Sequence, residues 1–166
     1  MIISYNIQIC RFYFFIFRKA LKIIVTSLNF YYNEKNTNKK DKKMAQTILT
    51  FGLGKETLRA VRETAQKNGI QVKEISRKDY NQKLGALAGI QGFSKENTTY
   101  KGPEFPLEMM IFSGTDSAKM HTFLDDYKQT GAQPVPLKAI ITPHNIFWTV
   151  ETLFNELKKE YLHFNK

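Results

Sequence analysis

The apolar positions between Thr47 and Ile75 change their period twice. Thr47–Phe51 is a short β-rich run, and Lys55–Asn68 then places its apolar residues at helical spacing until Gly69. Ile70–Ile75 alternates apolar and polar residues, which is typical of a strand with one buried face. This order predicts a strand–helix–strand unit.

The same order recurs later in the chain. Met109–Phe112 and Val135–Ile141 are apolar runs, and Asp116 between them is suited to cap a helix because its carboxylate accepts hydrogen bonds from free backbone N–H groups. The two expected helices match at a constant offset in the numbering, which predicts an internal repeat. The matched positions are Leu58, Val61, Ala65 and Gly69 in the first helix and Met120, Phe123, Tyr127 and Gly131 in the second.

The remaining segments predict one short helix, one long loop and one terminal helix. Leu84–Ile90 is a short apolar helix by composition, and Gln91–Pro106 is rich enough in glycine and proline to be a loop. Val150–Leu162 places its apolar residues on one helical face. Thr149 is its expected cap, with the pair at 142–143, Thr followed by Pro, as the alternative.

Two such units with right-handed crossovers predict the fold class. If the units pair antiparallel, the result is an α+β, ferredoxin-like βαβ–βαβ sandwich with an extra C-terminal helix. Because the connection between the units is long, an α/β open doubly wound sheet is the alternative.

The composition changes at Met44. Ile, Phe, Tyr, Asn and Lys fill 28 of the first 43 positions but only 39 of the following 123, and these are the residues that A- and T-rich codons encode. We therefore interpret residues 1–43 as a spurious or disordered extension, and 44–166 as a single small α/β domain. A surface-associating basic segment and a targeting peptide are the alternatives for 1–43. The apolar run Phe12–Phe17 is too short, and too closely flanked by basic residues, for a membrane span.

Charge and cysteine content narrow the classes of function. Residues 1–43 carry nine Lys and Arg against two acidic residues, whereas 44–166 carry 16 against 13, so most of the basic excess lies in the extension. The only cysteine, Cys10, also lies there, which leaves 44–166 without a thiol for disulfides, zinc–thiolate sites or catalysis. We expect a cytoplasmic domain with no membrane span, and its small charge argues against nucleic acid as a partner.

No catalytic or metal-binding arrangement is evident in the sequence. His121, His144 and His163 have no metal-ligand spacing, and neither G-x-S-x-G nor S-x-x-K occurs. We therefore expect no catalytic residue, no metal and no cofactor.

Two segments are candidate binding sites. Gly52, Gly54 and Lys55 follow a strand and open a helix, where free N–H groups suit an anion, although neither a Walker A nor a Rossmann pattern is complete; a simple turn is the alternative. The second segment, 136–149, is the densest cluster of special residues. Its candidate ligand-binding residues are Lys138, Thr142, His144, Asn145 and Trp148.

The second segment has two interpretations. In the functional one, Lys138 supplies charge and Trp148 one wall of a pocket for a small anion or a peptide. In the structural one, Trp148 closes the core and Asn145 bonds the backbone of its own loop.

Several motifs in the second half resemble a bacterial family. The segments LGALAGIQG (84–92), MIFSG (110–114), PLKAIITPHNIFW (136–148) and LFNEL (153–157) are similar to the family catalogued as domain of unknown function 3783, over about residues 46–161. The resemblance implies a small, cytosolic protein and supplies no activity, substrate or site residue.

Three functions remain in competition. A regulatory or ligand- or protein-binding module without catalytic activity is the first, and an enzyme or sensor for a small anionic metabolite at Lys138 and Thr142–Asn145 is the second. RNA binding on an open sheet face is the third, and it is weakened because 44–166 holds only three arginines.

Overall fold

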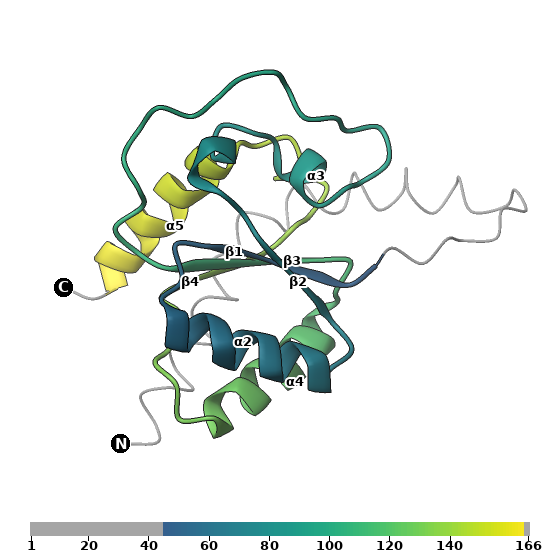
Figure 1. Ribbon diagram of the computed structural model, residues 1–166, viewed down its shortest axis with the longest axis vertical. Coiled ribbons are helices and arrows are strands. Elements are labelled where there is room, and N and C mark those ends of the chain that lie inside the picture. Colours follow the sequence, from purple (N-terminus) through teal and green to yellow (C-terminus); the bar gives the residue numbers. More distant parts are fainter. Residues whose placement is uncertain (1–44, 165–166) are drawn as a thin grey trace, which may run out of the picture. The chain divides into compact units, whose positions relative to one another are not determined.

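The computed structural model describes residues 45–164, so the predicted extension 1–43 lies outside the described residues. Within that range, nine elements follow in order (Figure 1). They are β1 (Thr47–Phe51), α2 (Lys55–Lys67), β2 (Gln71–Glu74), the short 3-10 helix η1 (Arg77–Asp79), α3 (Leu84–Leu87), β3 (Met109–Ser113), α4 (Ser117–Gln129), β4 (Leu137–Ile140) and α5 (Val150–Phe164).

The four strands form one mixed sheet in the order β2-β1-β3-β4. β1 pairs in parallel with β2, β3 pairs in parallel with β4, and β1 pairs antiparallel with β3 at the centre. The expected α and β content and the central antiparallel pair of units are confirmed, but the ferredoxin-like strand order is wrong. A split βαβ unit leaves room for a foreign strand between its own two strands. Here β2 instead lies directly beside β1, and β4 directly beside β3. Relative to the ferredoxin-like order, the two outer strands, β2 and β4, are therefore exchanged. The sheet has helices on both faces, as the α/β alternative expects, but its strand directions are mixed.

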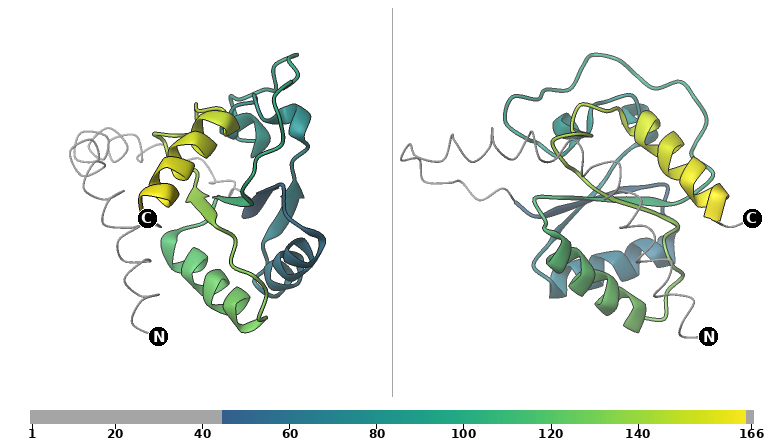
Figure 2. Two further views of the ribbon diagram at one scale, coloured as in Figure 1. Left: turned by 90° about the vertical axis from the view of Figure 1, so that its left-hand side faces the viewer. Right: turned by 180° about the vertical axis from the view of Figure 1, so that it is seen from behind.

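Helices cover both faces of the sheet, as Figures 1 and 2 show. α2 and α4 lie together on one face, where the ring of Phe123 meets that of Phe112 edge-on at 5.3 Å. α3, α5 and the connector 88–108 lie on the other face. There the ring of Phe105, in the connector, stacks between those of Tyr80 and Phe154, with centroid distances of 4.2 and 3.9 Å. β1 and β3 are buried along their whole length, so the core extends on both sides of the sheet.

The helix ends agree with the sequence signals. Asp116 accepts a hydrogen bond from the N–H of Lys119 at 2.7 Å, which confirms its role as a cap. Thr149 accepts one from the N–H of Thr152 at 3.1 Å, so α5 begins after Thr149 rather than at the pair 142–143. α3 occupies the front of the predicted short helix, and the predicted loop between α3 and β3 contains no helix or strand.

The predicted internal repeat is confirmed. α2 and α4 each span 13 residues, and their first residues, Lys55 and Ser117, stand at the offset that the sequence predicts. Each helix is followed by a glycine with positive φ, Gly69 at 66° and Gly131 at 72°. The loop between helix and strand is longer in the second repeat, so the offset grows from 62 in the helices to 66 from β2 and β4 onward.

The two repeats are related by an approximate two-fold axis. In the central strand pair, the axis passes between Leu49 and Ile111, which face each other at equivalent positions. A second set of contacts repeats the relation in the layer above the sheet. Leu84 N–H donates to the Trp148 carbonyl at 2.9 Å, and Val150 N–H donates to the Gln82 carbonyl at 3.2 Å. The two donors occupy equivalent positions of the repeats, at the offset of 66, and so do the two acceptors.

Candidate functional site

The turn 142–145 uses most of its polar groups to hold its own shape. The buried Asn145 side chain accepts from the N–H of Thr142 at 2.8 Å and donates to the Ile140 carbonyl at 3.0 Å. The N–H of Asn145 in turn donates to the Thr142 hydroxyl at 3.4 Å. These bonds match the structural interpretation of Asn145 and leave few of these groups available to a ligand.

Lys138 is directed away from that turn. Its ammonium donates to the carbonyl of Val135, which precedes β4, whereas the turn follows the end of β4. The side chain lies on the α4 face, since its register partner Met110 is next but one to Phe112, which packs on α4. Burial of the ammonium lowers the pKa of Lys138 to about 8. The structure therefore does not gather Lys138 and the turn into one pocket, and a ligand-binding role for them stays a prediction.

Aromatic side chains gather instead beside the turn. Phe147 is 63% exposed and its ring meets that of Phe93 at 5.2 Å, and His144 meets Trp148 edge-on at 5.3 Å. Trp148, two residues before the start of α5, is half-buried rather than sealed in the core. These are two separate ring pairs, brought near each other in the chain by residues 144–148, and we call the set Phe93, His144, Phe147 and Trp148 the aromatic surface.

Two members of the aromatic surface were missed by sequence reasoning. Phe147 stands in a turn outside the helical period of α5, and an apolar residue out of period in a turn was the available signal. Phe93 lies much earlier in the chain, in the connector, and no sequence signal places it beside Phe147.

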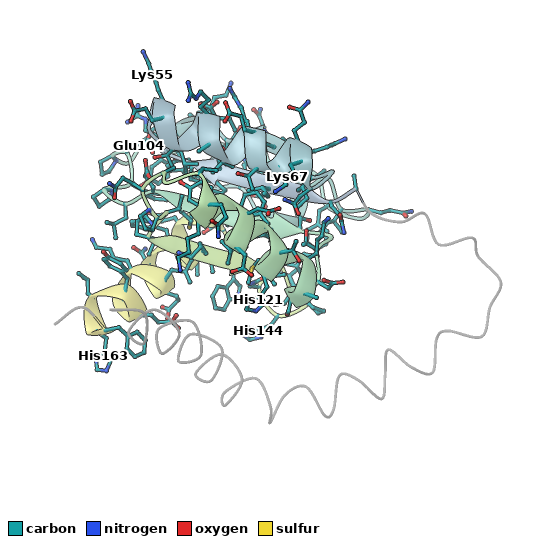
Figure 3. All side chains as sticks on the ribbon, turned by 90° about the horizontal axis from the view of Figure 1, so that it is seen from below. Lys55, Lys67, Glu104, His121, His144 and His163 are labelled. Carbon is teal, nitrogen blue, oxygen red and sulfur yellow. The ribbon has the colours of Figure 1, made fainter. Side chains whose placement is uncertain are left out.

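The glycine turn before α2 already holds a carboxylate. The N–H of Gly54 donates to Glu108 at 2.7 Å, while Gly52 provides the positive φ of 62° and Lys55 is exposed at the helix start (Figure 3). An external anion would have to displace Glu108. The anion-binding role of these residues stays a prediction.

A second carboxylate of the connector lies close by. Glu104 accepts a hydrogen bond from the hydroxyl of the buried Tyr80, and burial and this bond together raise the pKa of Tyr80. The connector thus closes the strand-end region of the first repeat with its own side chains.

Metal ligands are not grouped in the part of the chain that the structure describes. Among residues 45–164, no three His, Cys, Asp or Glu side chains come together as a metal site requires. Figure 3 shows His163 on α5, apart from His121 and His144. Within the same residues, no helix has the length and apolar character needed to cross a bilayer.

The central strands of the sheet offer RNA no open face, although most residues of the edge strand β2 are exposed. β1 and β3 are buried, and helices or the connector lie over both sides of the described sheet. An RNA-binding sheet requires exposed aromatic side chains on an open face. The geometry therefore argues against the third of the competing functions.

Comparison with curated proteins found no match, and comparison with solved structures found none. Comparison with protein families found one match, to the family described as "Domain of unknown function (DUF3783)", over residues 108–164. This range contains β3, α4, β4 and α5, which is the second repeat, whereas the resemblance was expected to begin near Gln46. The resemblance predicted from the sequence is confirmed there, and the chain carries a DUF3783 domain over residues 108–164.

Proposed function

We propose that this domain is a binding module for a protein partner and that the aromatic surface is its contact site. The observation that supports the proposal is the exposure of Phe147, at 63%, with Phe93 against it. Fully burying a phenylalanine side chain contributes about 1.5–3 kcal/mol, and at Phe147 the larger part of the side chain is still available for burial by a partner. Phenylalanine and tryptophan are also enriched in the cores of protein interfaces.

The small-anion alternative has less support from the same region. Binding an anion there would compete with the bonds that Asn145 and Thr142 make within their turn. Lys138, the intended counter-charge, donates to Val135 and faces α4. A protein contact through the neighbouring rings requires none of these bonds to break.

The proposal is tested by selecting displayed peptides for binding to the full chain. Each selected peptide is then measured against Phe147→Ser and against Leu162→Ser, a matched control that removes another large apolar side chain, 50% exposed, from α5. We expect Phe147→Ser to weaken binding at least about tenfold, as loss of a central aromatic anchor does, and Leu162→Ser to leave it unchanged. Equal binding by the wild type and both variants, or no enrichment at all, would contradict the proposal.

A further inference from the structure

We propose that the aromatic surface holds a linear, non-helical segment of its partner along residues 144–149, in the way that the first repeat holds its own connector along 78–83. This inference rests on the proposed function and specifies the form of the partner. It follows from the approximate two-fold axis, which places one stretch at the position of the other.

The equivalence of the two stretches is fixed by backbone hydrogen bonds. Gly85 N–H donates to the Ile146 carbonyl at 3.0 Å, and Glu151 N–H donates to the Tyr80 carbonyl at 3.0 Å. The two donors differ in numbering by the same offset as the two acceptors, and this is the offset between β2 and β4. Position 81 therefore corresponds to Phe147, and position 82 corresponds to Trp148.

In the first repeat, the equivalent surface is occupied by the connector segment 95–100, which contains no helix or strand. The Gln82 side chain donates to the carbonyls of Glu96 and Thr98, at 2.9 and 3.1 Å, and accepts from the N–H of Glu96 at 2.7 Å. Tyr100 N–H donates to the carbonyl of Lys78 at 2.9 Å. The amide of Gln82 thus holds a passing main chain, and that contact buries Gln82 almost completely.

Side chains of the same segment add to this contact. The Asn81 amide donates to the Thr98 hydroxyl at 2.9 Å. Lys83 pairs with Glu96 and Lys95 with Asp79, at 2.9 and 2.7 Å. The first repeat therefore binds a polar linear segment through a polar surface.

In the second repeat, the same positions carry rings that are only partly covered, Phe147 by Phe93 and Trp148 by His144. Phe147 replaces the amide of Asn81 and is 63% exposed, and the half-buried Trp148 replaces Gln82. The course of the backbone is shared because the backbone hydrogen bonds are shared, but the side chains at these two positions are aromatic. The occupant that the aromatic surface fits is a linear peptide that presents a large aliphatic or aromatic side chain to Phe147 and Trp148.

Trp148 supplies a direct signal for occupancy, since it is the only tryptophan in the chain. We would select two peptide libraries on the full chain, one made linear by frequent proline and one constrained to helices. Selected peptides are then titrated while the Trp148 emission is followed. The binding variant is Phe147→Asn, which installs the residue type of the first repeat, and the control variant is Leu162→Ser.

We expect linear peptides to shift the Trp148 emission to shorter wavelength, to bind Phe147→Asn at least about tenfold more weakly, and to bind Leu162→Ser like the wild type. If only helical peptides bind, and if they lose affinity in Phe147→Asn, the proposed function stands and the linear occupant is wrong. If peptides from neither library lose affinity in Phe147→Asn, both proposals fail. A Trp148 emission that changes on dilution of the protein alone, but not in Phe147→Asn, would make the occupant a second copy and overturn the inference.

Discussion

Lys83 and Thr149 form an isolated antiparallel bridge and occupy equivalent positions of the two repeats. A bridge between equivalent positions lies on the two-fold axis, as the pair Leu49 and Ile111 does in the sheet. The repeats thus meet each other in the sheet and again in the layer above it. This contact resembles the isologous interface of a dimer, in which the same surface serves both partners.

Loss of the Gln82 side chain should release the connector. Gln82→Leu removes the hydrogen bonds to the main chain of Glu96 and Thr98, and a typical hydrogen bond contributes about 0.5–1.5 kcal/mol to stability. We expect urea unfolding to show that loss and the Glu96 amide to exchange faster. Gln91→Leu, at an exposed position of the connector, is the control. Unchanged exchange at Glu96 would contradict the assignment of Gln82 as the clamp.

A methyl group at position 85 should displace the Phe93 ring. A Cβ added to Gly85 would lie 2.6 Å from that ring, closer than real contacts allow. Gly85→Ala should therefore cost about 1–3 kcal/mol of unfolding free energy, as overpacking does. In a Phe93→Ala background the same substitution should cost little, because the clash is gone. Equal costs in the two backgrounds would show that Phe93 does not pack there.

Asn145→Ala should destabilise the turn that presents the aromatic surface. The substitution leaves the Thr142 N–H and the Ile140 carbonyl without their side-chain partner, at a cost of about 1–3 kcal/mol. Thermal or urea unfolding measures the change, and Asn155→Ala, at an exposed position of α5, is the control. If Asn145→Ala is as stable as the wild type, the Asn145 side chain is not needed to hold the turn, and a role in binding a ligand gains support.

The sequence allowed the elements and the repeat to be predicted because those depend on local signals. Helical spacing, the Asp116 cap and the glycines at 69 and 131 each act within a few residues. The strand order could not be predicted in this way. Whether β2 lies beside β1 or beside β3 depends on which packing buries more surface, and one sequence does not encode that choice locally.

In the candidate site, too, the contacts between neighbours in sequence could be predicted, whereas those between distant residues could not. Asn145 bonds its own turn through neighbours in sequence, so its structural interpretation was available from the pattern. The direction of Lys138 depends on which face of the sheet its position takes, and that depends on the register with β3. The contact of Phe147 with Phe93 joins two residues that are distant in sequence, through a connector that has no period to read.

Residues 1–43 should add nothing to the stability of the domain. The composition break at Met44 supports this expectation, and β1 begins at Thr47 with a complete repeat following it. Urea unfolding is compared for the full chain and for Met44–Lys166. We expect equal midpoints and equal slopes, since the slope reports the surface exposed on unfolding. A large drop in midpoint on truncation would make the extension part of the fold.

The stability of the domain should rise between about pH 8 and pH 9.5 because of Lys138. Burial lowers its pKa from an ordinary 10.5 to about 8. In that range the unfolded chain keeps the proton and the folded chain loses it, so the unfolded state binds more protons and the free energy of unfolding rises with pH. The expected rise is about 1–2 kcal/mol, at about 1.36 kcal/mol for each unit of pKa difference that is crossed.

The comparison variant for this rise is Lys138→Met, which removes the titrating group and keeps the apolar stem. We expect urea unfolding of Lys138→Met to be flat from about pH 7 to 9.5, whereas Lys101→Met, at an exposed lysine, should keep the wild-type rise. The range ends there because burial raises the pKa of Tyr80 and Tyr127, which ionise more readily when unfolded and lower the stability at higher pH. The same rise in all three proteins would mean that Lys138 is as well hydrated in the folded chain as in the unfolded one.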